Sequence, residues 1–138
     1  MGTVEKLDIQ GVSHEYFAAW EARDPHRIVE LHTPDSCFHL HAGVEPAKGR
    51  DAVREAFRQV FEQWPGFRFE TRRVLYGKDH WVLDWDLLAT LEVERNGERA
   101  DKPVRLHCLD VVTVDPEGLV SRKDTFVDVA QVNALMAR

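Results

Sequence analysis

Two closely spaced histidines are among the side chains of this sequence that could perform chemistry. His39 and His41 flank a single leucine in the stretch HLHAGVEPAKG. An imidazole can act as acid, base or metal ligand near neutral pH. Because residues i and i+2 of a strand share a face, the pair could hold a metal ion. No third ligand stands at a diagnostic spacing, so we predict no metal and a strand that runs into a turn.

Asp110 is a carboxylate with apolar neighbours. In a strand over residues 104–114 it alternates in phase with Leu106, Cys108, Val112 and Val114. Burial without a cation partner disfavours the charged carboxylate, and a neutral Asp110 could donate a hydrogen bond to a developing oxyanion. A purely structural Asp110, bonded to other side chains or to the backbone, stays open as the alternative.

The same alternation sorts the other polar residues of the strands. Asp124 shares a face with Phe126, which we interpret as inward. Asp84 and Asp86 face outward, so we expect them to be solvated or part of an interface. His107 lies on the outer face of its strand, at the surface or in an interface.

Apolar periodicity predicts which elements carry these residues. Three helices come first: one over 4–22, one opened by Asp24 and Pro25, and one that begins at Asp51 and ends at Pro65. Strands are predicted next, over 37–42, 67–76, 80–94, 103–114 and 119–127, with a hairpin turn at Asn96-Gly97. The tail after residue 128 fits a short helix or an extended arm. This order predicts an α+β fold in which a curved, mostly antiparallel sheet wraps the helices as a cone.

Composition narrows the class of protein. The 138 residues fit one domain over 1–138, and the net charge of −6 argues against a nucleic-acid surface. No apolar run is typical of a signal peptide or long enough to span a bilayer. Two cysteines, Cys37 and Cys108, fit buried thiols in a reducing cytoplasm. No glycine-rich phosphate loop is present, and no cofactor is expected.

Two segments resemble a known family. The run EYFAAWEARDPHRIVELHTPDSCFHLHAGVEPAKGRDAVREAF resembles the N-terminal half of bacterial ketosteroid isomerases, within the nuclear-transport-factor-2-like superfamily. The run CLDVVTVDPEGLVSRKDTF is similar to that family's fifth and sixth strands. The resemblance implies a cystatin-like α+β barrel around a pocket, and a homodimer through the outer face of the sheet, where Leu109 and Val111 lie.

The resemblance also implies roles for single residues. The family's oxyanion tyrosine matches Tyr16, and its protonated oxyanion aspartic acid matches Asp110. Its general base falls on Leu40, so the base is missing. Leu40 would then face the pocket and the two flanking histidines would face away. A bulge at the strand end could still turn His41 inward, which leaves His41 as a minor candidate for the base.

SnoaL-like polyketide cyclases, which are related, carry an acid/base aspartate on the last strand, and Asp124 resembles that position. We therefore hypothesise a pocket in which Asp124 is the base and Tyr16 and Asp110 hold an enolate. The residues expected to contact the substrate are Trp20, Leu40, Trp64, Trp85, Cys108 and Phe126. The hypothesis is a cofactor-independent isomerase, cyclase or dehydratase for a small apolar carbonyl compound.

Two other functions remain open from the sequence. The first is a non-catalytic module that binds a small apolar molecule or oligomerises, because a fold alone does not imply catalysis. The second is epoxide hydrolysis, for which limonene-epoxide hydrolases use an Asp-Arg-Asp arrangement. Asp110, Arg122 and Asp124 could supply it, although their order does not match that family well.

Overall fold

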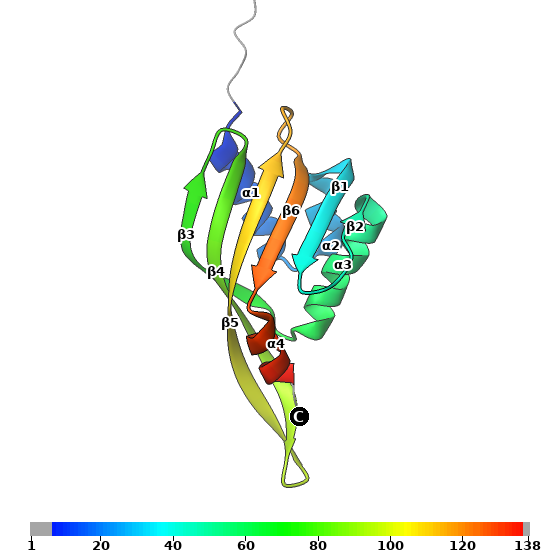
Figure 1. The fold of residues 1–138 in the computed structure, drawn as a ribbon, viewed down its shortest axis with the longest axis vertical. Coiled ribbons are helices and arrows are strands. Elements are labelled where there is room, and N and C mark those ends of the chain that lie inside the picture. Colours follow the sequence, from blue (N-terminus) through cyan, green and yellow to red (C-terminus); the bar gives the residue numbers. More distant parts are fainter. Residues whose placement is uncertain (1–6, 137–138) are drawn as a thin grey trace, which may run out of the picture.

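The computed structural model describes residues 7–136, so residues 4–6 of the first predicted helix lie outside the described part. The helices are α1 (Ile9–Glu21), α2 (Pro25–Glu30), α3 (Arg50–Gln63) and α4 (Val129–Met136). The strands are β1 (His32–His41), β2 (Ala47–Lys48), β3 (Arg68–Tyr76), β4 (His80–Arg95), β5 (Glu98–Val114) and β6 (Val120–Val127) (Figure 1).

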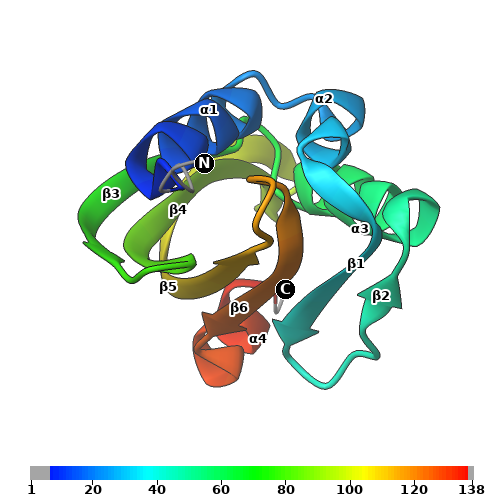
Figure 2. The same ribbon diagram turned by 90° about the horizontal axis from the view of Figure 1, so that it is seen from above.

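The strands form one mixed sheet in the order β2-β1-β6-β5-β4-β3. Only the β1–β6 pair is parallel in this described sheet, and the other neighbours are antiparallel. The sheet is strongly curved and does not close, and α1, α2 and α3 lie along its open side (Figure 2). This architecture confirms the predicted α+β cone around three N-terminal helices.

Local signals explain where the helices begin and end. The Asp24 side chain accepts hydrogen bonds from the backbone N–H groups of His26 and Arg27, and Pro25 takes the first helical position of α2, as predicted. Helix α1 begins later than residue 4, because the Asp8 side chain caps it by accepting from the Gly11 N–H. The tail forms a helix, α4, rather than an extended arm.

The long β4–β5 hairpin is better paired than the sequence indicated. Its turn is Asn96-Gly97, where both residues have positive φ (54° and 80°), as a type I′ turn requires. Pairing continues without interruption from Arg95↔Glu98 to His80↔Thr113, so β5 begins at Glu98 and not at residue 103. The end of the hairpin projects beyond the body of the molecule (Figure 1).

A bulge in β6 reverses the alternation that the sequence suggested. Thr113 of β5 pairs with Arg122, whereas the next residue, Val114, pairs with Val120, so Ser121 is an extra residue on β6. An extra residue changes which face the following side chains occupy. Val120 and Lys123 are consequently both buried, although they are three positions apart.

The core lies on the concave face of the sheet. The predicted inward residues of β4 are buried there, namely Trp81, Leu83, Trp85, Leu87 and Ala89. Leu91 and Val93, which lie nearer the hairpin turn, continue the alternation but are only partly buried. The concave face therefore combines a filled core with the pocket described next.

Candidate active site

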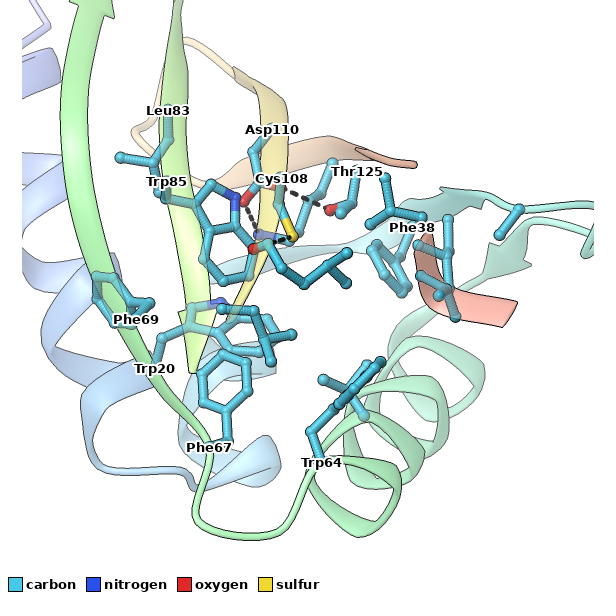
Figure 3. A pocket seen from close by; sticks show the side chains of 18 of the residues that line it. Trp20, Phe38, Trp64, Phe67, Phe69, Leu83, Trp85, Cys108, Asp110 and Thr125 are labelled. Atoms are coloured by element: carbon cyan, nitrogen blue, oxygen red, sulfur yellow. Dashed lines mark hydrogen bonds and ion pairs between the residues drawn. The ribbon is translucent and has the colours of Figure 1, made fainter. Parts of the chain in front are cut away.

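An aromatic pocket of about 260 Å³ lies between the concave face of the sheet and the helices (Figure 3). Its aromatic lining consists of Tyr16, Phe17, Trp20, Phe38, Trp64, Phe67, Phe69, Trp81 and Trp85. Small-molecule sites usually span about 300–1,000 Å³. The volume therefore suits a compact ligand of one or two rings.

Most of the predicted contact residues line this pocket. Trp20, Trp64, Trp85 and Cys108 are all on its wall. Leu40 also faces it, together with other residues of the β1 face, so the predicted orientation of the HLH stretch is confirmed. Burial raises the pKa of the Cys108 thiol, which leaves the thiol as a neutral part of the wall.

The polar centre of the pocket is a buried ion pair that the sequence analysis did not predict. Lys123 of β6 donates from Nζ to Asp110 Oδ2 at 2.8 Å, and Thr125 Oγ1 donates to Asp110 Oδ1 at 2.8 Å. All three residues are buried and line the pocket. Asp110 is therefore not alone among apolar residues, and its two accepting oxygens are the pattern of a carboxylate rather than of a neutral donor.

Lys123 remains charged in these surroundings. Burial alone would lower its pKa, but the negative charge of Asp110 beside it holds the pKa above its ordinary value. The ammonium nitrogen lies 4.7 Å from the centre of the Trp20 ring and 5.4 Å from that of Tyr16. Cation–π attraction to these two faces adds to the ion pair with the carboxylate. The pocket thus holds a cation and an anion in contact.

Tyr16 lines the pocket as predicted, but its hydroxyl is bonded to a histidine. The Tyr16 Oη lies 2.8 Å from His32 Nε2, and His32 Nδ1 lies 3.1 Å from Ser36 Oγ. Burial, with help from nearby Lys123 and Arg50, lowers the pKa of His32 to about 3, so the imidazole is neutral. Burial also raises the pKa of Tyr16. The Tyr16 phenol is therefore a neutral group that the hydrogen bond to His32 holds in place.

Asp124, the predicted base, lies on the opposite face of the sheet. Because of the bulge at Ser121, the pocket side of β6 carries Lys123 and Thr125, and Asp124 points outward. It accepts from Arg122 Nε at 2.8 Å and Nη2 at 3.0 Å, and lies 2.8 Å from His41 Nε2. The prediction that Asp124 is a base in the pocket is wrong.

The same bulge corrects two further predictions. Phe126 is 42% exposed on the outer face and is not part of the pocket wall. Arg122 and Asp124 are separated from Asp110 by the sheet, so the Asp-Arg-Asp arrangement proposed for epoxide hydrolysis does not form.

The two minor histidine candidates also lie outside the pocket. His41 stacks on Phe126 on the outer face, with ring centres 4.1 Å apart. His107 is exposed and is hydrogen-bonded to Asp84. The predicted outward orientation of Asp84 is confirmed by this contact. Neither histidine can reach a ligand in the pocket.

Three indole donors in the pocket wall lack hydrogen-bond partners among the described residues. These are the Nε1–H groups of Trp20, Trp81 and Trp85, all of which are more than nine-tenths buried. A buried N–H group without a partner is costly, and an oxygen atom of a ligand would satisfy it. The wall therefore favours a ligand that is mainly apolar but carries hydrogen-bond acceptors.

Comparison with known proteins identifies the family. The sequence model of the SnoaL-like domain matches residues 14–123, which is most of the chain. The chain belongs to the SnoaL-like domain family. No curated protein matches it. None of the helices over residues 7–136 is both long and apolar enough to cross a membrane.

Solved structures with the same fold include several members of this family. A candidate SnoaL-like polyketide cyclase from Jannaschia sp. CCS1 is 19% identical, with a TM-score of 0.78 over 99% of each chain. SalBIII, an epoxide hydrolase/cyclase-like enzyme in pyran ring formation in salinomycin, is 21% identical, with a TM-score of 0.73 over 93% of this chain and 96% of its own.

A third similar structure carries the fold that the sequence resembled. It is a protein with a ketosteroid isomerase-like fold from Catenulispora acidiphila, in complex with trimethylamine. It is 14% identical, with a TM-score of 0.73 over 89% of each chain. At these identities the likeness establishes the shared fold of the SnoaL-like chain and not its activity.

Sequence reasoning missed two residues of this SnoaL-like pocket, Lys123 and Thr125, and also missed the buried His32 that is bonded to Tyr16. The first two were assigned to the outer face because strict alternation was carried through Ser121. His32 has no local signal, because its partner Tyr16 is in a different element.

Proposed function

We propose that this SnoaL-like protein is a cofactor-independent acid–base enzyme that acts on a small, largely apolar carbonyl compound. The observation that carries the proposal is the Asp110–Lys123 ion pair at the wall of an aromatic pocket. An acid–base enzyme needs a proton acceptor and a group that stabilises the developing oxyanion. The ion pair supplies both at one point.

Asp110 takes the part of the base in this proposal. Its carboxylate would accept a proton from the carbon next to the substrate carbonyl, and the electron pair of the broken C–H bond would form the enolate double bond. The negative charge then moves to the carbonyl oxygen, which the Lys123 ammonium would stabilise. Return of the proton to another carbon gives isomerisation, and attack of the enolate carbon on a second carbonyl gives cyclisation.

The surrounding groups support this division of roles. Thr125 orients the Asp110 carboxylate through the 2.8 Å hydrogen bond, and the indole N–H groups of Trp20 and Trp85 are free to bond to substrate oxygens. Tyr16, held by His32, forms the wall beside Lys123. The mainly apolar lining lowers the local dielectric constant, which strengthens the electrostatic interactions at the ion pair.

A non-catalytic binding module is the second candidate, and one observation favours it. Both oxygens of Asp110 already have donors, so the ion pair could serve only to satisfy the hydrogen bonds of buried polar groups in the pocket. In that case the protein binds an apolar ligand without moving a proton. The two candidates share the pocket and differ in acid–base chemistry.

Hydrogen–deuterium exchange of a ketone separates the two candidates. The protein would be incubated in D₂O with 2-tetralone, a bicyclic ketone, and loss of the α-proton signal followed by NMR. Binding would be measured in parallel by quenching of the tryptophan fluorescence. We expect the α-protons to exchange faster with the protein than in buffer alone, and the protein-dependent rate to saturate as the ketone concentration rises. Saturable quenching with exchange at the buffer rate would instead support the binding module.

A further inference from the structure

The outer face of the sheet carries a second cluster of reactive side chains, well separated from the pocket. His39 and His41 of β1 face outward because Leu40 faces the pocket. In the parallel β1–β6 pair, His39 lies opposite Asp124. We call His39, His41 and Asp124 the outer triad. The sequence alone offered no third ligand for the two histidines, and the pairing of the strands provides one.

The geometry of the outer triad suits a metal ion. One ligand atom from each of its three side chains lies within 4.8 Å of the other two. Two ligands bonded to one zinc ion are separated by about 3–3.5 Å, so modest rotations of the side chains bring the set into range. Residues i and i+2 on one strand and a neighbour on the next strand make a three-cornered set with an open side toward solvent.

Neighbouring side chains already hold two members of the outer triad in place. Phe126 stacks on the ring of His41, with an interplanar angle of 10°. Arg122 Nε donates to Asp124 Oδ2 at 2.8 Å, and this bond can persist when Oδ1 exchanges its hydrogen bonds with Arg122 Nη2 and His41 Nε2 for a metal. Supporting contacts of this kind orient metal ligands, and their loss commonly weakens metal affinity by about 10–100-fold. The positive Arg122 also limits the affinity, since it partly neutralises the carboxylate.

We propose that the outer triad binds a divalent transition-metal ion such as zinc, with solvent completing the coordination. Two imidazole nitrogens and one carboxylate oxygen are a donor set that suits zinc, nickel, cobalt or iron(II). Magnesium and calcium prefer oxygen ligands, so they compete poorly. All three side chains are only partly buried, which leaves a path for the ion from solvent.

Calorimetric titration with zinc chloride tests this site on protein stripped of metal with EDTA and then freed of chelator. We expect one zinc ion per chain in the wild type. His39→Gln and Asp124→Asn each remove one ligand, and each should weaken the binding at least tenfold. His107→Gln is the matched control, because His107 is also a histidine of the outer face bonded to an aspartate, and it should leave zinc binding within twofold of the wild type.

Circular dichroism would first verify that the variants are folded. A tenfold excess of magnesium should not displace the zinc. The proposal is overturned if His39→Gln and Asp124→Asn bind zinc like the wild type, if the wild type shows no saturable binding, or if His107→Gln weakens the binding as much as the other two.

Discussion

Loss of Lys123 should destabilise the protein strongly, because the change leaves a charged Asp110 buried. In Lys123→Met, the carboxylate would retain only the hydrogen bond from Thr125. The side chains of Lys123 and Asp110 are 6% and 3% exposed, so water cannot replace the lost partner. The two side chains therefore form a buried ion pair, and removal of one partner from such a pair strongly lowers the free energy of unfolding.

The expected size follows from the distance between the charges. At 2.8 Å and an effective dielectric constant of about 20, their attraction amounts to about 6 kcal/mol. Desolvation of the two ions costs several kcal/mol each and offsets most of this attraction in the intact pair. We expect Lys123→Met to lower the free energy of unfolding by about 3–5 kcal/mol. Asp110→Asn, which keeps the shape, should cost a similar or smaller amount.

The double variant gives the sharper result. With both charges removed, Lys123→Met combined with Asp110→Asn should be more stable than Lys123→Met alone and should recover most of the loss. Urea unfolding followed by tryptophan fluorescence measures all four proteins, since chains of this size commonly unfold in one transition. Arg58→Met, which breaks the exposed ion pairs with Glu55 and Glu62, is the control and should not change the midpoint detectably.

Two results would refute this reasoning. A loss below about 1 kcal/mol for Lys123→Met would be that of an ordinary surface substitution and would mean that the pair is hydrated. Additive losses in the double variant would mean that the two side chains do not interact.

Three further predictions concern other parts of the molecule. Burial lowers the pKa of His32 to about 3 from an ordinary 6.5, so on mild acidification only the unfolded chain binds a proton at this imidazole. The contribution of His32 should therefore lower the free energy of unfolding by about 2 kcal/mol when the pH falls from 7 to 5. Urea unfolding of His32→Gln at both pH values should show a correspondingly smaller decrease, and an unchanged decrease would contradict the burial of a neutral imidazole. Trp85→Phe removes an unpartnered indole N–H and should weaken 2-naphthol binding about tenfold in a fluorescence titration, whereas equal affinity would mean that this donor does not meet the ligand. The homodimer remains a prediction, and analytical ultracentrifugation of the wild type should show a dimer. Leu109 lies on the outer face beside Phe126, so Leu109→Lys should give a monomer. A monomeric wild type would contradict the predicted homodimer.

The sequence allowed correct predictions where the signal was local. The N-cap at Asp24 followed by Pro25, and the hairpin turn at Asn96-Gly97, depend on a few neighbouring residues and formed as expected. The inward face of β4 was also predicted correctly, because uninterrupted alternation determines which side chains are buried. The orientation of Leu40 followed from the resemblance and is confirmed by the pocket.

The parts that failed depend on partners distant in the sequence. The bulge at Ser121 arises from the pairing of β6 with β5, and no residue type near it announces an extra position. Because this extra residue was not recognised, Asp124 and Phe126 were predicted to face the pocket and Lys123 was predicted to face outward. The neutral Asp110 was in turn predicted from the resemblance and from its apolar neighbours, because its partner Lys123 had been assigned to the other face.

The rate of α-proton exchange in Asp110→Asn tests the central claim most directly, because the claim assigns the base to this one carboxylate. The measurement uses 2-tetralone in D₂O at saturating concentration, with binding confirmed by fluorescence. Asp84→Asn is the matched control, since Asp84 lies on the outer face in contact with His107 and Arg73. We predict that Asp110→Asn lowers the exchange rate of the bound ketone by about 10²–10⁴-fold and that Asp84→Asn leaves it unchanged. Wild-type exchange that persists in folded, ligand-binding Asp110→Asn would contradict the assignment of Asp110 as the base.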